Sequence, residues 1–209
     1  MKGNSLFIVF EGIDGAGTTT QAKLLKDWLM SKGYNVHLTA EPSDNFIGNT
    51  IRQILRKRIV PSEDSLKDGI DHKTIALLFA ADRLDHIQNE IAPLLKNKHI
   101  VISDRYTISS IVYQGEYTHD EQWVEIINKY ALIPDITFFI DIDGAIAFDR
   151  ITKRELALEI FEKKNKLIDL SNKYKKVVKN QKNIVTLDGT LKISEISSLI
   201  RKKIEFNFL

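Results

Sequence analysis

The sequence predicts an α/β protein in which a five-stranded parallel sheet has helices on both faces, a three-layer fold. Short apolar runs without helical spacing alternate along the chain with longer segments of helical periodicity. Strands separated by helices favour parallel βαβ units. The 209 residues suit one compact domain, 1–209, because they exceed a small stapled scaffold and fall short of two full domains.

The strands are expected where apolar runs end at polar or glycine-containing turns. These runs are 6–10, 35–40, 99–103, 136–141 and 183–187. Helical spacing is found between them, at 19–32, 46–58, 71–96, 107–117, 120–132, 144–153, 156–181 and 192–204. Gly33 and Pro134 mark the ends of two helices, and Pro93 predicts a bend or an end in the longest one.

Composition excludes several classes of protein. The chain has no cysteine, which excludes disulfides, thiolate metal sites and a cysteine nucleophile, and which fits a reducing compartment. The longest apolar runs, such as 6–10 and 136–140, fall far below the roughly 20 residues that span a bilayer. The first residues lack the pattern of a secretory signal. We therefore expect a cytoplasmic protein with no membrane partner.

The net charge of +2 is unevenly distributed. Residues 150–209 hold 15 Lys and Arg against 7 Asp and Glu, whereas residues 1–149 hold 15 against 21. A basic segment of this kind can contact nucleic acid or a polyphosphate. Here the basic residues are spread along a helical pattern without interleaved aromatic side chains, so a solvated helix face is favoured and no nucleic-acid partner is expected.

The first predicted strand leads into a glycine-rich turn that opens a helix. Ligands of parallel sheets bind at the carboxyl ends of the strands, and a curled loop before a helix N-terminus suits a polyphosphate. In the P-loop pattern G-x-x-x-x-G-K-[ST], Gly12, Gly17 and Thr19 match, but Thr18 stands at the lysine position. Read alone, the segment is also compatible with a strand-to-helix turn that binds nothing.

Residues 10–21 read F-E-G-I-D-G-A-G-T-T-T-Q, and residues 78–83 read L-F-A-A-D-R. These segments resemble, in the same order, the F-E-G-x-D-G-x-G-K-[ST]-T-Q loop and the L-F-A-A-[DN]-R segment of the thymidylate kinase family. Residues 104–115 resemble its D-R-Y-x-x-S-S-x-A-Y-Q-G signature. Shorter similarities occur at 41–42 (R-E-P, with Ala40 where arginine is usual), 47–52, 134–135 and 185–190. The resemblance covers nearly the whole chain. It implies the P-loop NTPase fold of nucleoside-monophosphate kinases and phosphate transfer from ATP to dTMP in dTTP synthesis.

The resemblance also implies which residues meet each nucleotide. For ATP and its phosphates they are Gly12, Ile13, Asp14, Gly15, Ala16, Gly17, Thr18, Thr19, Thr20 and Arg150. For dTMP they are Asp14, Glu41, Pro42, Arg52, Phe79, Arg83, Arg105, Ser109, Tyr113 and Gln114. In this assignment Arg52 and Arg105 hold the dTMP phosphate and Phe79 stacks on thymine. Taken singly, such residues are also compatible with surface ion pairs, core aromatics and polar helix surfaces.

The resemblance implies that Arg83, Ser109 and Gln114 face the base edge. It also implies that Asp14 contacts the sugar 3′-hydroxyl and that Tyr113 lies beside the 2′ position.

Catalysis is expected to depend on positioning and charge rather than on a general base, because phosphoryl transfer needs little acid–base chemistry. Asp104 and Thr19 are the expected organisers of Mg²⁺, which binds mainly to phosphates and waters in such sites. The resemblance also implies a short lid around 150–158, which would carry Lys153 and Arg154 over ATP and let Arg150 pack on adenine. With Arg105 and Asp104, those two lid residues form the expected catalytic set. A solvated basic helix is the alternative for that segment.

Three functions remain open from the sequence alone. The first is a dTMP kinase, and the second is a kinase for another nucleotide or deoxynucleoside. The third is a nucleotide-binding homologue with weak or no catalysis, because Thr18 replaces the P-loop lysine. The family resemblance further implies a homodimer. For His86, a surface position is favoured over one lining the cleft.

Overall fold

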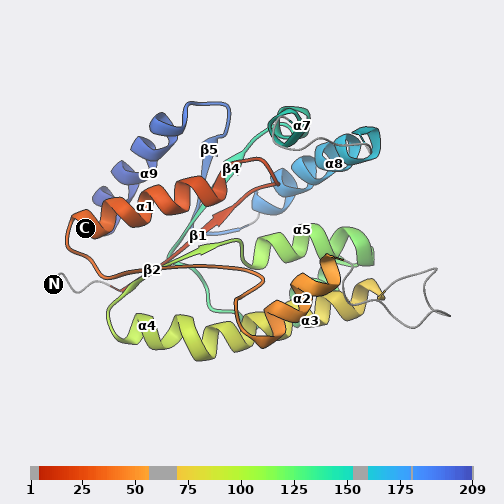
Figure 1. The fold of residues 1–209 in the computed structure, drawn as a ribbon, viewed down its shortest axis with the longest axis horizontal. Helices are drawn as coiled ribbons and strands as arrows, with labels where there is room; N and C mark the ends of the chain where they lie inside the picture. Colours follow the sequence, from red (N-terminus) through yellow and green to blue (C-terminus); the bar gives the residue numbers. More distant parts are fainter. Residues whose placement is uncertain (1–4, 57–69, 153–159, 180, 209) are drawn as a thin grey trace.

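The structure, a computed structural model, describes residues 5–56, 70–152, 160–179 and 181–208 (Figure 1). Its centre is a single sheet with the strand order β2-β3-β1-β4-β5, in which every neighbouring pair is parallel. The strands are β1 (Leu6–Glu11), β2 (Val36–Ala40), β3 (Ile100–Asp104), β4 (Ile136–Asp141) and β5 (Ile184–Asp188). All five lie within one residue of their predicted bounds. The predicted α/β class with a five-stranded parallel sheet is therefore confirmed.

Helices lie against both faces of this sheet. Figure 1 shows α1 (Thr18–Ser31) and α9 (Ile193–Phe208) on one side, with α3 (His72–His86), α4 (Ala92–Lys96) and α5 (Thr107–Thr118) on the other. The remaining helices of the described residues are α2 (Phe46–Leu55), α6 (Glu121–Ile127), α7 (Gly144–Thr152) and α8 (Ile160–Val178). None of the described helices is long and apolar enough to cross a bilayer.

The side chains of β1 show why both faces need cover. Ile8 and Phe10 belong to a large buried cluster that includes Leu25 from α1, whereas Phe7 and Val9 belong to a smaller buried cluster on the other face. Successive side chains of a strand point to opposite faces, so a strand that is apolar throughout must be covered on both. The core thus fixes β1 in the middle of the sheet and places its carboxyl end centrally.

Several helices differ from their predicted bounds. Helix α2 ends at Leu55 and helix α8 at Val178, each three residues before its predicted end. The longest predicted helix is interrupted by a π-helix, Ile87–Ile91, between α3 and α4. Pro93 is the second residue of α4, and a proline has no amide hydrogen to continue the regular helical hydrogen-bond pattern with the preceding turn. α6 ends at Ile127, because the Asn128 side chain instead donates to the Val124 carbonyl oxygen and receives a hydrogen bond from Arg83. α9 continues to Phe208, with Ile204 buried in the core.

The register brings the chemically important strand ends to one level. Phe10 in β1 lies opposite Asp104 in β3 and Phe138 in β4, and Asp141 in β4 lies opposite Asp188 in β5. The loops that follow β1, β3, β4 and β5 therefore meet at a single edge of the sheet, as expected for ligand sites in parallel sheets.

Candidate active site

A glycine-rich loop connects β1 to α1 and leaves an open helix N-terminus. Gly15 and Gly17 have φ angles of 83° and 98°, a left-handed conformation that glycine adopts without strain. A Cβ atom on Gly15 would lie 2.7 Å from the Ala147 carbonyl oxygen, whereas one on Gly17 would meet nothing within 4 Å. Gly17 is the N-cap residue, and no side chain caps α1. The free amide groups of this end thus face open space, where they can bind an anion.

A cavity of about 780 Å³ lies over this loop. Its lining includes nine of the ten residues predicted for ATP: Ile13, Asp14, Gly15, Ala16, Gly17, Thr18, Thr19, Thr20 and Arg150. Gly12 lies beneath them, where a Cβ atom would come within 3.1 Å of the Ile140 carbonyl oxygen. Arg105 and Lys192 also line the cavity. Arg150 donates to the Gly189 carbonyl oxygen over 2.9 Å, so this arginine is tied to the loop after β5.

Thr18 is a structural residue as well as a departure from the P-loop pattern. Its side chain is buried, at 6% exposure, and its methyl group would lie 3.3 Å from a Cβ atom on Gly12. The lysine position of the loop thus packs inward and supplies no charge. Lys153 and Arg154, the predicted lid residues, lie outside the described residues.

A small oxygen cluster lies beside this loop. The Thr19 hydroxyl donates to Asp104 Oδ2. Asp104 Oδ1 is buried and has no hydrogen-bond partner among the described residues. Carboxylate and hydroxyl oxygens suit a hard cation such as Mg²⁺. Within the part of the chain that the structure describes, no group of three or more His, Cys, Asp or Glu residues is arranged to hold a metal. An ion at Asp104 would therefore draw most of its ligands from phosphates and water.

A second cavity, of about 460 Å³, is bounded by α3, α5 and the turn after β2. Its lining includes nine of the ten residues predicted for dTMP: Asp14, Glu41, Pro42, Phe79, Arg83, Arg105, Ser109, Tyr113 and Gln114. The volume lies within the range of ligand sites. Gln114 Oε1 is buried and has no partner among the described residues, so a polar acceptor is available in an otherwise largely apolar site.

Arg52 is the predicted dTMP residue that is not in the lining of this cavity. Its guanidinium donates to the carbonyl oxygens of Pro42 and Ser43 and lies 2.9 Å from Asp44. In the described arrangement Arg52 therefore stabilises the turn after β2, which carries Glu41 and Pro42 into the cavity.

Arg105 lies where the two cavities meet, and Asp14 is the other residue that lines both of them along with it. The guanidinium is 2.5 Å from Asp14 Oδ1 and lies over the Tyr113 ring at 5.1 Å. The φ angle of Arg105 is 75°, a region that residues with side chains rarely adopt. Its amide donates to the Phe10 carbonyl oxygen over 2.8 Å, which fixes this conformation. Such outliers are concentrated at functional sites.

Sequence reasoning did not single out Glu11, the last residue of β1. This carboxylate is completely buried and accepts hydrogen bonds from the amides of Tyr106 and Ser109 and from two hydroxyl groups, those of Ser109 and Tyr174. Burial raises the pKa of Glu11 above its ordinary value, although the Ser109 hydrogen bonds and the Arg105 charge partly oppose this. Glu11 thereby anchors the start of α5 beside Arg105. A charged residue at the end of a fully apolar strand was the available signal.

Arg83 and His86 form a second feature that the sequence did not predict. Arg83 lines the smaller cavity, but it is 1% exposed and donates to Glu41, Asn128, Ser110 and the Tyr106 carbonyl oxygen. His86 is fully buried, so the favoured surface position was wrong. Its ring lies against the end of β2, beside Thr39. Glu41, which follows that strand, and Glu90, in the π-helix after α3, offer the ring two acceptors.

The fold and site define a class of enzyme. A glycine-rich loop opening a helix, a carboxylate at the end of the neighbouring strand, and a second cavity joined to the first at an arginine are the features of P-loop nucleotide kinases.

Comparison with known proteins identifies the family within that class. The sequence model of the family described as Thymidylate kinase matches residues 10–200. A probable thymidylate kinase of Thermococcus kodakarensis is 42% identical over 78% of this chain and 80% of its own length. Those of Methanosphaera stadtmanae and Methanocaldococcus jannaschii are each 40% identical. The matches cover 95% and 92% of this chain, and 97% and 91% of the relatives.

The chain belongs to the thymidylate kinase family. This confirms the predicted family and enzyme class, an ATP-dependent dTMP kinase, and does not favour the alternatives of another acceptor or of a non-catalytic homologue.

Proposed function

We propose that ATP occupies the larger, glycine-lined cavity, that dTMP occupies the smaller one, and that the γ-phosphoryl group passes between them at Arg105. The single observation that carries this assignment is that Arg105 and Asp14 line both cavities. An acceptor phosphate entering from one side and a donor phosphate from the other would meet at the guanidinium, whose planar donors match phosphate oxygens.

The chemical step needs no general base from the protein. An oxygen of the dTMP phosphate attacks the γ-phosphorus while the bond to the bridging oxygen of ADP breaks, giving dTDP and ADP. Arg105 would stabilise the charge spread over the transferring group. The amides of the loop at 12–17 would hold the donor phosphates. When bound near Thr19 and Asp104, Mg²⁺ would neutralise further phosphate charge.

The smaller cavity would select thymidylate through its shape and its few polar groups. Phe79 offers a stacking surface, Gln114 an unpaired acceptor for the base edge, and Tyr113 a wall near the sugar. The 5-methyl group of thymine adds only about 1–3 kcal/mol of discrimination in an apolar pocket. We therefore expect dTMP to be preferred and dUMP to be accepted weakly.

A panel of acceptors tests this function. ADP release is measured with ATP and each of dTMP, dUMP, dCMP, AMP and thymidine, with no acceptor as the control for ATP hydrolysis. The expected order places dTMP first and dUMP second. Faster turnover of dCMP or AMP would contradict the assignment of the cavity. Binding of ATP and dTMP without turnover would support the non-catalytic alternative.

The lid, the oligomer and the compartment also remain proposals. Lys153 and Arg154 are proposed to close over ATP as part of a lid at about 150–158. A homodimer is supported by the exposed apolar side chains of Phe46 on α2 and of Leu77 and Leu84 on α3, because such surfaces often mark protein interfaces. Light scattering at several concentrations tests the dimer. A cytoplasmic location is supported by the absence of cysteine.

A further inference from the structure

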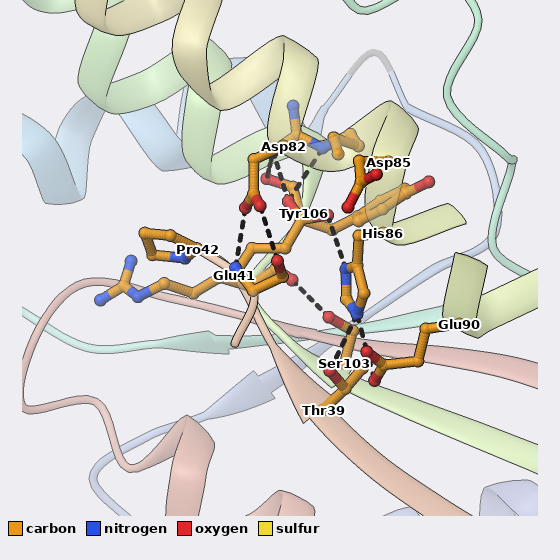
Figure 2. A network of polar contacts seen from close by, with 12 residues as sticks. Thr39, Glu41, Pro42, Asp82, Asp85, His86, Glu90, Ser103 and Tyr106 are labelled. Atoms are coloured by element: carbon orange, nitrogen blue, oxygen red, sulfur yellow. Dashed lines mark hydrogen bonds and ion pairs between the residues drawn. The ribbon is translucent and has the colours of Figure 1, made fainter. Parts of the chain in front are cut away.

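A cluster of charged side chains is buried beneath the proposed dTMP cavity, and the transfer step does not use it directly (Figure 2). Helix α3 supplies three of its members: Asp82, Arg83 and His86. Glu41, which follows β2, is the carboxylate that Arg83 and His86 share. Buried charges are costly unless they are paired, so each of these contacts constrains the others.

Both ring nitrogens of His86 face oxygen acceptors. Nδ1 lies 3.4 Å from Glu41 Oε1, and Nε2 lies 2.8 Å from the Thr39 hydroxyl and 3.4 Å from Glu90 Oε1 (Figure 2). A neutral imidazole carries one N–H, whereas an imidazolium carries two. Because a carboxylate lies on either side of the ring, only the doubly protonated form can donate a hydrogen bond to both of them.

The surroundings of His86 favour its charged form. Burial alone lowers the pKa of His86, but the carboxylates of Glu41, Glu90 and Asp82 outweigh it, and the net effect raises the pKa above the ordinary value. The titratable and charged groups around the ring, from all the elements packed there, are Glu41, His37, Asp82, Arg83, Glu90 and Tyr106. The charged ring is thus the partner of a predominantly acidic environment.

From His86 a short chain of contacts leads to the cavity wall. Glu41 Oε2 accepts hydrogen bonds from Arg83 Nε (2.9 Å) and Nη2 (2.5 Å). Nη2 also donates to the Tyr106 carbonyl oxygen over 3.2 Å and to the Ser110 hydroxyl over 3.0 Å. Glu41, Arg83, Tyr106 and Ser110 all line the cavity, whereas His86 is not in its lining. His86 therefore reaches the nucleotide site through Glu41.

We propose that His86 is a positioning residue for the acceptor nucleotide: as an imidazolium it fixes Glu41, which in turn fixes Arg83 and the three walls of the cavity that Arg83 joins. These walls are the turn after β2, helix α3 and the start of α5. The proposal rests on the assignment of dTMP to this cavity. Loss of the His86 proton leaves Glu41 held by Arg83 alone, and this loosens the acceptor site while the glycine-rich loop is untouched.

The test separates the two nucleotides. KM for dTMP and KM for ATP are measured from about pH 6 to about pH 9, a range that spans the ordinary titration of histidine, in the wild type, His86→Gln and His37→Gln. A glutamine in place of His86 keeps a polar side chain but cannot titrate. His37 is the matched control, because it contacts Glu90 at 2.7 Å and is 38% exposed.

We expect the dTMP KM of His86→Gln to be about tenfold above wild type at low pH, equivalent to about 1.4 kcal/mol. The ratio of the dTMP KM of His86→Gln to that of the wild type should approach one as pH rises, because His86 of the wild type then loses its extra proton. The phosphate of dTMP titrates equally in all assays and cancels in this ratio. KM for ATP should stay unchanged, and His37→Gln should follow the wild type. A ratio that is flat with pH, or an equal rise in KM for ATP, would overturn the proposal.

A second measurement uses the wild-type protein and covers the case in which His86→Gln does not fold. If protonation of His86 favours dTMP binding, then dTMP binding must raise the pKa of His86 by linkage. Histidine NMR titrations with saturating dTMP should show an upward shift of about one pH unit for His86, equivalent to the tenfold effect on binding, and ATP alone should show none. No shift with dTMP would overturn the proposal. Failure of the wild type to phosphorylate dTMP would instead contradict the proposed function.

Discussion

The two halves of the site are constructed in different ways. The donor half is made largely of backbone, since the loop at 12–17 and the open N-terminus of α1 supply amide groups that no single side chain provides. The acceptor half depends on buried side chains, among which Glu41, Arg83 and His86 hold one another and the walls of the cavity. Loss of one side chain from the donor half should therefore disturb the structure of the site little, whereas a change in the acceptor half propagates to neighbouring side chains.

The most severe test concerns the residue at which the two halves meet. Arg105→Ala should lower kcat with saturating dTMP and ATP by about 10³-fold or more, because arginines that stabilise a transferring phosphoryl group contribute on that scale. The fold should persist, because the hydrogen bond from the Arg105 backbone amide to the Phe10 carbonyl oxygen does not involve the side chain. Steady-state assays and circular dichroism measure both effects.

Arg150→Ala is the control for this variant, because Arg150 also lines the donor cavity but bonds to the Gly189 carbonyl oxygen. It should change KM for ATP far more than kcat. Normal turnover in Arg105→Ala would remove Arg105 from the reaction and break the proposed junction.

Loss of a carboxylate from the acceptor half should lower the free energy of unfolding more than loss of a carboxylate from the surface beside it. Glu41→Ala removes the carboxylate between two buried cationic groups, Arg83 and His86, and should lower the free energy of unfolding by about 3–5 kcal/mol. Asp44→Ala also removes the carboxylate partner of an arginine, but Asp44 is 95% exposed and this loss should be within about 1 kcal/mol.

Urea unfolding of both variants measures the difference. Equal stabilities for Glu41→Ala and Asp44→Ala would show that the buried cluster is not what holds this cavity.

The sequence predicted the sheet well because each strand is an apolar run that ends at a turn. It could not predict burial that depends on several elements meeting. His86 is on a helix between Asp85 and Ile87, and its burial follows from the approach of the end of β2 and of Glu90. Arg52 was assigned to the dTMP phosphate by motif, and this assignment stays a prediction; in the structure its guanidinium lies on the turn after β2. A motif identifies a residue type at a position, and tertiary contacts decide where its charged group lies.

A smaller effect is expected from a residue that is proposed to contact the base but does not hold the walls of the cavity together. Gln114→Ala removes the unpaired acceptor that lies in the cavity and should raise KM for dTMP by about 10- to 100-fold, or about 1–3 kcal/mol. KM for ATP and thermal stability should change little, because the described residues offer no partner to Gln114 Oε1 that would be lost. An unchanged KM for dTMP would place the base elsewhere.

The smallest expected effect concerns Thr18, where the chain departs from the P-loop pattern. Thr18→Lys should raise kcat about tenfold, equivalent to about 1.4 kcal/mol of transition-state stabilisation. A lysine there would bring a positive charge to the β- and γ-phosphates. A longer side chain at this position can extend into the donor cavity, which Thr18 lines. The gain is limited because backbone amides already hold the donor phosphates.

Thr18→Gln is the matched control for that variant, since glutamine extends the side chain without adding charge. If charge is what Thr18 lacks, lysine raises kcat and glutamine does not. Neutralising Lys153 and Arg154 together should abolish the native activity, and Thr18→Lys should restore part of it, because all three charges would act on the same phosphates. Equal kcat for threonine and lysine, or a decrease, would mean that packing of Thr18 against Gly12 matters more than the missing charge. In that case the donor half would depend on a side chain as closely as the acceptor half does.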